Sequence, residues 1–77
     1  MLRELDTVAL TRDLLDYGLV KGDIGAIVHR YPKGEAFEVE FVTAAGDTVA
    51  VVTLTSREVR PLLGREILHV REMALVG

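Results

Sequence analysis

Two glutamates, Glu38 and Glu40, are the side chains of this sequence best placed for acid–base chemistry. Residues i and i+2 of a strand lie on one face of a sheet, so the two carboxylates could act together as acid and base. The alternating positions are apolar: Phe37, Val39 and Phe41. This alternation is typical of a strand with one buried and one solvated face. We therefore interpret Glu38 and Glu40 as an acidic contact surface that could steer a basic partner, not as a catalytic pair.

The other residues that could do chemistry do not form recognisable constellations. A metal site needs three or four converging ligands, whereas the only histidines, His29 and His69, are far apart in the sequence. Ser56 is the sole serine and does not stand in a Gly-x-Ser-x-Gly turn. The glycines of residues 18–25 are not followed by the Gly-Lys-Ser/Thr of a phosphate loop, and the chain has no cysteine. We expect a protein that is not an enzyme, with no metal and no cofactor.

Composition predicts one small folded domain. The chain has 77 residues, a net charge of −3 and a hydrophobic fraction of 49%. This length leaves room for a single core, and the hydrophobic fraction argues against disorder. No basic start with an apolar centre resembles a signal peptide, and no apolar run approaches the roughly 18 residues of a membrane helix. We expect a soluble cytoplasmic domain without membrane contact.

The charge pattern argues against nucleic acid as the partner. Nine Lys and Arg residues are interleaved with twelve acidic residues. Proteins that bind phosphate backbones usually carry a basic patch or an excess of positive charge. The rival interpretation remains an RNA-contacting module, in which three cations near expected loop tips would touch the backbone: Lys21, Arg30 and Lys33.

Short strands separated by turns must position these residues. Segments rich in Val, Ile, Thr and Phe recur at the spacing typical of a small all-β domain. Five strands are predicted, over residues 6–12, 24–31, 36–43, 48–54 and 59–62. Residues 13–21 form a long loop in which Leu14, Tyr17 and Leu19 are expected to point inward. A single helical turn is expected over residues 55–58, with Thr55 or Ser56 as its cap.

Two segments carry more apolar surface than one small core requires. In the fourth strand, residues 49–52 are apolar on both faces. The segment after Gly64 fits a strand or a helix about equally well, and its β-branched residues favour a strand slightly. We predict that this strand and this segment form a partner interface. Its residues are Val49, Val51, Ile67, Leu68, Val70, Met73 and Leu75.

Four stretches together resemble a known family: LDTVAL at 5–10, GLVKGDIG at 18–25, FEVEF at 37–41 and TL at 53–54. The family consists of short bacterial proteins classified as a domain of unknown function, with a predicted SH3-like fold. The resemblance covers residues 5–62. It implies an antitoxin-like, immunity or accessory-subunit role and no catalytic residues. The Lys-Gly-Asp-x-Gly stretch at 21–25 is more loosely similar to KOW-type barrels of ribosomal and transcription proteins.

These observations predict an all-β protein. Residues 1–62 would form a small SH3-like barrel of about five antiparallel strands, and residues 63–77 a C-terminal extension that is an extra strand or a short helix. Recognition of proline-rich peptides is not expected, because such grooves are lined with aromatic residues and this chain has no Trp. The expected function is non-enzymatic binding of a companion protein or of a second copy, as a homodimer. The alternative is a KOW-like RNA-contacting module.

Overall fold

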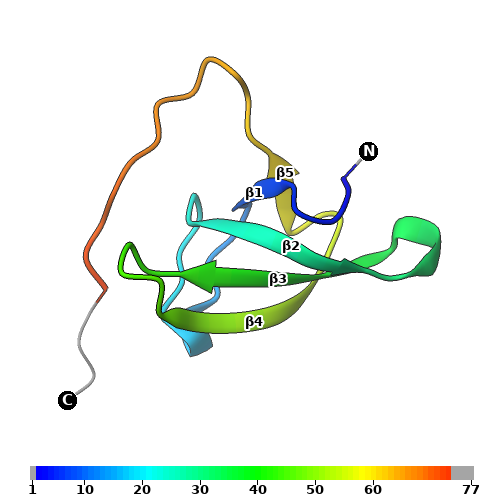
Figure 1. Ribbon diagram of the computed structural model, residues 1–77, viewed down its shortest axis with the longest axis horizontal. Coiled ribbons are helices and arrows are strands. Elements are labelled where there is room, and N and C mark those ends of the chain that lie inside the picture. The colour runs from blue at the N-terminus through cyan, green and yellow to red at the C-terminus, as the bar shows by residue number, and fades with distance from the viewer. Residues whose placement is uncertain (1, 74–77) are drawn as a thin grey trace.

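The computed structural model, which describes residues 2–73, is a single antiparallel sheet of five strands (Figure 1). The strands are β1 (Thr7–Leu10), β2 (Ile24–Arg30), β3 (Ala36–Val42), β4 (Thr48–Thr55) and β5 (Val59–Pro61). Two single turns of 3₁₀ helix, η1 (Leu15–Tyr17) and η2 (Pro32–Gly34), lie in the connections. The strand order is β4-β3-β2-β1-β5. The predicted all-β class and its five strands are confirmed, with ends that differ by at most two residues.

Alternation in β3 builds the centre of the core. Phe37, Val39 and Phe41 are buried, whereas Glu38 and Glu40 lie on the opposite face. Cross-strand pairing extends this apolar row to both neighbouring strands, because Val39 is opposite Ile27 of β2 and Val52 of β4. The complete buried cluster is Val8, Leu10, Leu19, Ile27, Phe37, Val39, Phe41, Val52, Leu54 and Val59.

The long loop between β1 and β2 contributes less to this core than predicted. Leu19 is buried and Leu14 packs partly against the cluster, as expected. Tyr17 was expected to point inward and instead is 48% exposed. It ends η1, which buries none of its residues, so the loop is anchored by the leucines that flank the turn.

A bulge in β4 explains its apolar run. Phe41 pairs with Ala50 and Val42 pairs with Thr48, which leaves Val49 as an extra residue. An extra residue shifts the alternation by one position, so the consecutive Val49 and Ala50 both pack against the core. The expectation that β4 presents a second apolar face is therefore corrected. Only Val51 of this run points outward, and it is 49% exposed.

The segment after β5 is neither the strand nor the short helix predicted for it. Residues 62–73, here called the C-terminal strap, contain no helix or strand. A turn in which the Glu66 N–H donates to the Leu63 carbonyl at 3.0 Å directs the chain away from the sheet. The strap then runs toward the end of the sheet where β3 and β4 are joined (Figure 1). Residues 74–76 of the predicted element lie outside the described residues.

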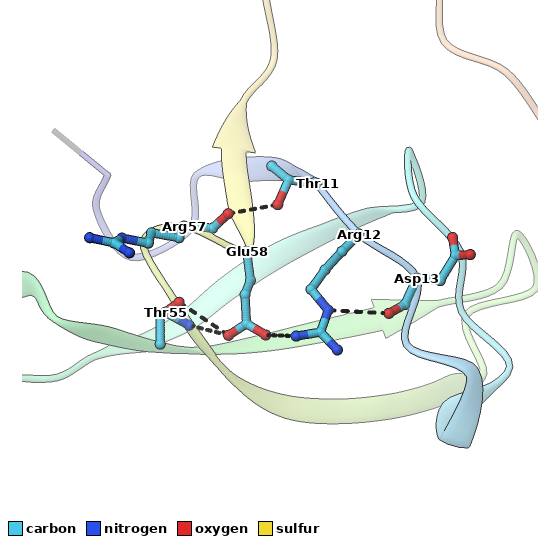
Figure 2. Close-up of polar contacts among 6 residues, drawn as sticks. All are labelled: Thr11, Arg12, Asp13, Thr55, Arg57 and Glu58. Atoms are coloured by element: carbon cyan, nitrogen blue, oxygen red, sulfur yellow. Dashed lines mark hydrogen bonds and ion pairs between the residues drawn. The ribbon is translucent and has the colours of Figure 1, made fainter.

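The connection between β4 and β5 is a single turn closed by a hydrogen bond from the Glu58 N–H to the Thr55 carbonyl at 3.0 Å, and it does not continue into a helix. Thr55 was expected to cap it through its side chain, but the Glu58 carboxylate does the bonding. Its Oε1 atom accepts hydrogen bonds from the Thr55 N–H at 2.9 Å and from the Thr55 hydroxyl at 3.1 Å (Figure 2). Ser56 is exposed and makes no such contact within residues 2–73.

Glu58 also ties this turn to the segment that follows β1. Its Oε2 atom accepts a hydrogen bond from Arg12 at 3.3 Å, and its carbonyl accepts one from the Thr11 N–H at 2.9 Å. The Thr11 hydroxyl donates to the Arg57 carbonyl at 2.7 Å (Figure 2). These contacts extend the β1–β5 pairing past the end of both strands.

Gly25 is required because side chains of the neighbouring strand β3 come close to it. A Cβ atom added to Gly25 would lie 2.7 Å from Cγ1 of Val39 and 2.9 Å from Cε1 of Phe41. Real side chains do not tolerate such distances in a packed core. Gly64, by contrast, has no atom within 4 Å of an added Cβ.

We predict that Gly25→Ala lowers the free energy of unfolding by about 1–3 kcal/mol, because the methyl group overpacks the core. Urea denaturation followed by circular dichroism measures the change. Gly64→Ala is the matched control and should leave the midpoint unchanged or raise it slightly. Equal midpoints for the two variants would contradict the close approach.

We predict that Glu58→Ala lowers the free energy of unfolding by about 1–2 kcal/mol, because the Thr55 N–H loses its acceptor. Glu58→Gln should cost less than about 0.5 kcal/mol. Its amide oxygen still accepts that hydrogen bond, and the lost charge faces an exposed Arg12. Equal losses in Ala and Gln variants would show that the ion pair matters more than the turn.

Candidate functional site

The strap is fastened at its base by one bidentate ion pair. Nη1 and Nη2 of Arg60 donate to Oε1 and Oε2 of Glu66 at 2.9 and 2.7 Å. The Leu63 N–H donates to the same carboxylate at 2.6 Å. The hydrogen bonds from Arg60, followed by the one from Leu63, lower the pKa of Glu66 to about 2, and the same pair raises the pKa of Arg60. The Arg60–Glu66 ion pair therefore stays charged across the physiological pH range.

A second ion pair fastens the far end of the strap across 48 residues of sequence. Nε of Arg71 donates to Oδ1 of Asp23 at 2.8 Å, and Nη2 donates to Oδ2 of Asp23 and to the Gly18 carbonyl. Partial burial opposes ionisation of Asp23. The hydrogen bonds from Arg71 and from the Val20 N–H outweigh it, so the pKa of Asp23 lies below its usual range. Asp23 thus belongs to both the tight turn before β2 and the strap contact.

Between the two ion pairs, the strap exposes apolar side chains. Ile67, Leu68 and Val70 are 86%, 65% and 96% exposed. They are three of the predicted interface residues. Of the other predicted residues on this segment, Met73 is half-buried. Its Cε atom lies 3.4 Å from the position that an added Cβ atom would take at Gly18. Leu75 lies outside the described residues.

A groove of about 460 Å³ separates the end of the strap from the end of the sheet. Strap residues 69–73 form one wall. The other walls come from the turn before β2 and from the ends of β3 and β4, with apolar side chains that include Leu19, Ile24, Phe41 and Val49. Two parts of the predicted interface, Val49 and the pair Val70 and Met73, are thus brought together. Val51, Ile67 and Leu68 do not line this groove.

The two predicted acidic residues lie on the outer face of the sheet and bond to neighbouring hydroxyl groups. Glu38 accepts hydrogen bonds from Tyr31 at 3.2 Å and from Thr53, and Glu40 accepts one from Thr48 at 2.8 Å. The hydrogen bond and the negative charge of Glu38 raise the pKa of Tyr31. Since Glu40 pairs with Val51 in register, the acidic row adjoins the exposed part of β4.

The structure does not bring together the three cations of the rival RNA-binding interpretation. Lys21 precedes β2, whereas Arg30 ends β2 and Lys33 lies in η2. The seven residues of β2, the last of which is Arg30, separate Lys21 from the other two cations, and they span about 20 Å at the rise of a strand. These cations therefore do not form one continuous patch.

The histidines are also separate. His29 lies in β2, with Nδ1 3.7 Å from Glu4 and its ring in a T-shaped contact with Tyr31, whereas His69 lies in the strap and lines the groove. Within residues 2–73, no three His, Cys, Asp or Glu side chains are grouped so as to hold a metal ion. None of the helices in this range is long and apolar enough to cross a membrane.

Sequence reasoning missed the residues that hold the strap. Arg60, Glu66, Asp23 and Arg71 were not singled out for this role. Arg60 and Glu66 are six residues apart, a spacing that acquires meaning only once the turn after Leu63 is known. The partners of the distal pair are too far apart in the chain for any local pattern to indicate them.

We predict that Arg71→Gln frees the far half of the strap without unfolding the sheet, because the distal ion pair is its main attachment there. Amide order parameters of residues 70–73 should fall below about 0.6, the range of flexible backbone. Arg65→Gln, in the exposed first part of the strap, is the matched control and should change nothing at these positions. Unchanged order parameters in the Arg71 variant would contradict the proposed attachment.

The distal attachment should also weaken in acid. Because the pKa of Asp23 is lowered by folding, its contribution is complete above the ordinary aspartate pKa and is lost as the pH falls through the folded value. The Arg60–Glu66 contact should persist until the pH approaches about 2, the pKa of Glu66. A pH series of order parameters should therefore show residues 70–73 loosening as the pH falls below the ordinary aspartate pKa, and unchanged order parameters across the acid range would contradict this assignment.

Comparison with known proteins gives one match. The model of a family described as a domain of unknown function, DUF4926, covers residues 4–61, which include all five strands and end where the strap begins. No curated protein and no solved structure matches the chain. The predicted resemblance to a family of unknown function is confirmed, and the family description states no fold type. The chain belongs to the DUF4926 family of domains of unknown function.

Proposed function

We propose that this domain is a non-enzymatic protein-binding module with an SH3-like barrel fold. The strand order supports the fold assignment. β1 to β4 follow one another across the sheet, and β5 returns to pair with β1 on the opposite edge. A connection of residues 56–58 joins these two edges, and so short a connection requires a strongly curled sheet. The deep burial of residues from all five strands in one cluster is consistent with such curling.

The observation that carries the binding function is the apolar surface of the strap. Three large apolar side chains within four residues, Ile67, Leu68 and Val70, are largely exposed. Scattered exposed apolar residues are ordinary, but three within four residues on a segment fastened at both ends are typical of a contact site. Fastening also removes part of the entropy that a free segment would lose on binding.

The backbone of the same segment can contribute to binding. Within residues 2–73, residues 67–70 make no backbone–backbone hydrogen bond. An extended segment with free N–H and C=O groups can pair with a strand of another protein, and its side chains then confer specificity. The proposed mechanism is therefore strand addition together with burial of the strap side chains.

A companion protein with a basic surface fits the charges of the domain. The net charge is −3, and Glu38 and Glu40 lie on the exposed face of β3 beside Val51. A basic partner would be steered toward this face and would meet the apolar residues at closer range. The domain would then act as an antitoxin-like or accessory subunit that masks or positions its companion. No catalytic or cofactor-binding role is assigned to any residue.

The proposal predicts that the strap is needed for partner capture. Ile67→Ser, Leu68→Ser and Val70→Ser combined should weaken binding of the companion protein by about tenfold or more, because three apolar side chains that the companion would bury are lost. The companion is identified by mass spectrometry from a native low-salt pull-down, purified, and titrated by calorimetry. Circular dichroism verifies that the variant is folded.

The matched control removes exposed apolar residues elsewhere. Leu5→Ser with Leu15→Ser changes two exposed leucines outside the strap and should leave the affinity unchanged. Equal losses in both variants would contradict a strap-specific site. Capture of RNA that is abolished by salt and by Lys21→Glu, Arg30→Glu and Lys33→Glu would instead favour the KOW-like alternative.

A further inference from the structure

The two edges of the sheet are protected very differently. β5 has three residues, Val59–Pro61, and contains an arginine and a proline. Short length, charge and proline are the usual means by which edge strands avoid pairing with other chains. β4, at the other edge, has eight residues with the sequence TVAVVTLT and contains no charge and no proline. Only the bulge at Val49, at its beginning, departs from a regular strand.

The outer edge of β4 has no strand partner within the described chain. β4 pairs with β3 on one side only, and the backbone hydrogen bonds found outside the strands do not reach residues 49–54. Half of the N–H and C=O groups of an edge strand point away from the sheet. Six of the eight residues of β4 are Val or Thr, which favour strand pairing. The edge is therefore able to accept another strand.

We propose that β4 pairs antiparallel with β4 of a second copy of this chain and so forms one continuous sheet across a two-fold axis. In such a pair, outward-facing residues of one β4 meet outward-facing residues of the other. The outward residues in the regular part of β4 are Val51, Thr53 and Thr55, which are uncharged and β-branched. No like charges would oppose each other, and β-branched pairs stabilise a sheet.

The acidic residues of β3 do not oppose this arrangement. The two β3 strands would be three strand spacings apart, about 14 Å. This distance exceeds the screening length of about 8 Å at physiological ionic strength, so Glu38 and Glu40 of the two copies would repel weakly. Both carboxylates also accept hydrogen bonds from threonines of their own β4. The strand at the edge is thus neutral, and the charges lie one strand inward.

This inference rests on the proposed function, because it names one protein partner of the module, but it uses the edge of β4 and not the strap. Strand pairing alone buries less surface than a typical stable interface. The dimer is therefore expected to be weak and to depend on concentration. The strap would remain free for a companion protein.

Cysteine crosslinking tests the pairing directly, because the natural chain contains no cysteine. Residues directly opposite in an antiparallel pair have Cα atoms about 4.5–5.5 Å apart, which suits a disulfide. The double variant Val51→Cys with Thr53→Cys places two thiols on the outward face. It can crosslink whether the two-fold axis lies at residue 51, 52 or 53. Glu38→Cys with Glu40→Cys is the matched control, with the same face and spacing on an interior strand.

Mild oxidation should convert the β4 variant to a disulfide-linked dimer several-fold faster than the β3 control. Sedimentation of the unaltered chain should show a concentration-dependent dimer of the 8.5 kDa protomer. Val51→Lys should weaken that dimer by about tenfold, because the introduced positive charge lies within two residues of the axis in both copies. Equal crosslinking of both cysteine variants, or a monomer at every soluble concentration, would overturn the inference.

The strap variant separates this inference from the proposed function. Ile67→Ser, Leu68→Ser and Val70→Ser combined should dimerise like the unaltered chain. If that variant abolishes dimerisation while Val51→Lys does not, the second copy docks on the strap. That result would overturn the β4 pairing and leave the strap as a protein-binding site. Normal dimerisation without any strap-dependent companion would support the pairing and contradict the proposed function.

Discussion

The length of the connection between β4 and β5 constrains the whole structure. The two strands lie on opposite edges of a five-stranded sheet, and in a flat sheet they would be about 19 Å apart. The four chain steps from Thr55 to Val59 span at most about 14 Å. The sheet must therefore curl until its edges approach. Curling concentrates the inward residues of all strands in one cluster, in which the side chains of Val39 and Phe41 leave room only for glycine at residue 25. The Glu58 contacts hold the short connection in place, so local bonding at one turn supports the packing of a core built from every strand.

The strap is held mainly by two ion pairs, and this determines what the apolar residues between them can do. An apolar segment that is anchored by packing must bury its side chains and cannot present them to another molecule. Here the base and the far end are fixed by the pairs Arg60–Glu66 and Arg71–Asp23, and the side chains between them stay exposed. Partly exposed ion pairs stabilise a protein only modestly. The two ion pairs therefore hold the strap in place while its apolar side chains stay exposed. Because these ion pairs contribute little stability, a molecule that binds the strap more strongly could displace it.

Much of the fold could be predicted because its signals are local. The alternation of Phe37, Val39 and Phe41 with Glu38 and Glu40 correctly indicated the buried and outer faces of β3, and short turn-bounded segments indicated the five strands. The apolar run of β4 was misread because strict alternation was assumed, whereas a bulge places Val49 and Ala50 on the same side. The conformation of the strap could not be predicted, because no periodic pattern determines it. Its path depends on ion pairs with residues on other elements, and the distal pair joins positions 48 residues apart.

The residues needed for folding differ from those that are available for binding. The core ends at Val59, and its closing strand at Pro61, so neither the strap side chains nor the outer edge of β4 is required to complete it. Monomeric proteins usually protect an exposed strand edge against pairing with other chains, as this chain does at β5 with Arg60 and Pro61. It does not do so at β4, where eight neutral residues remain, or in the strap, where the exposed side chains are large and apolar. These two unprotected surfaces differ in chemistry. The edge of β4 offers mainly backbone N–H and C=O groups, whereas the strap offers mainly apolar side chains. The proposed companion protein and the proposed second copy would therefore use different groups of the domain, as the proposed role of an accessory subunit requires.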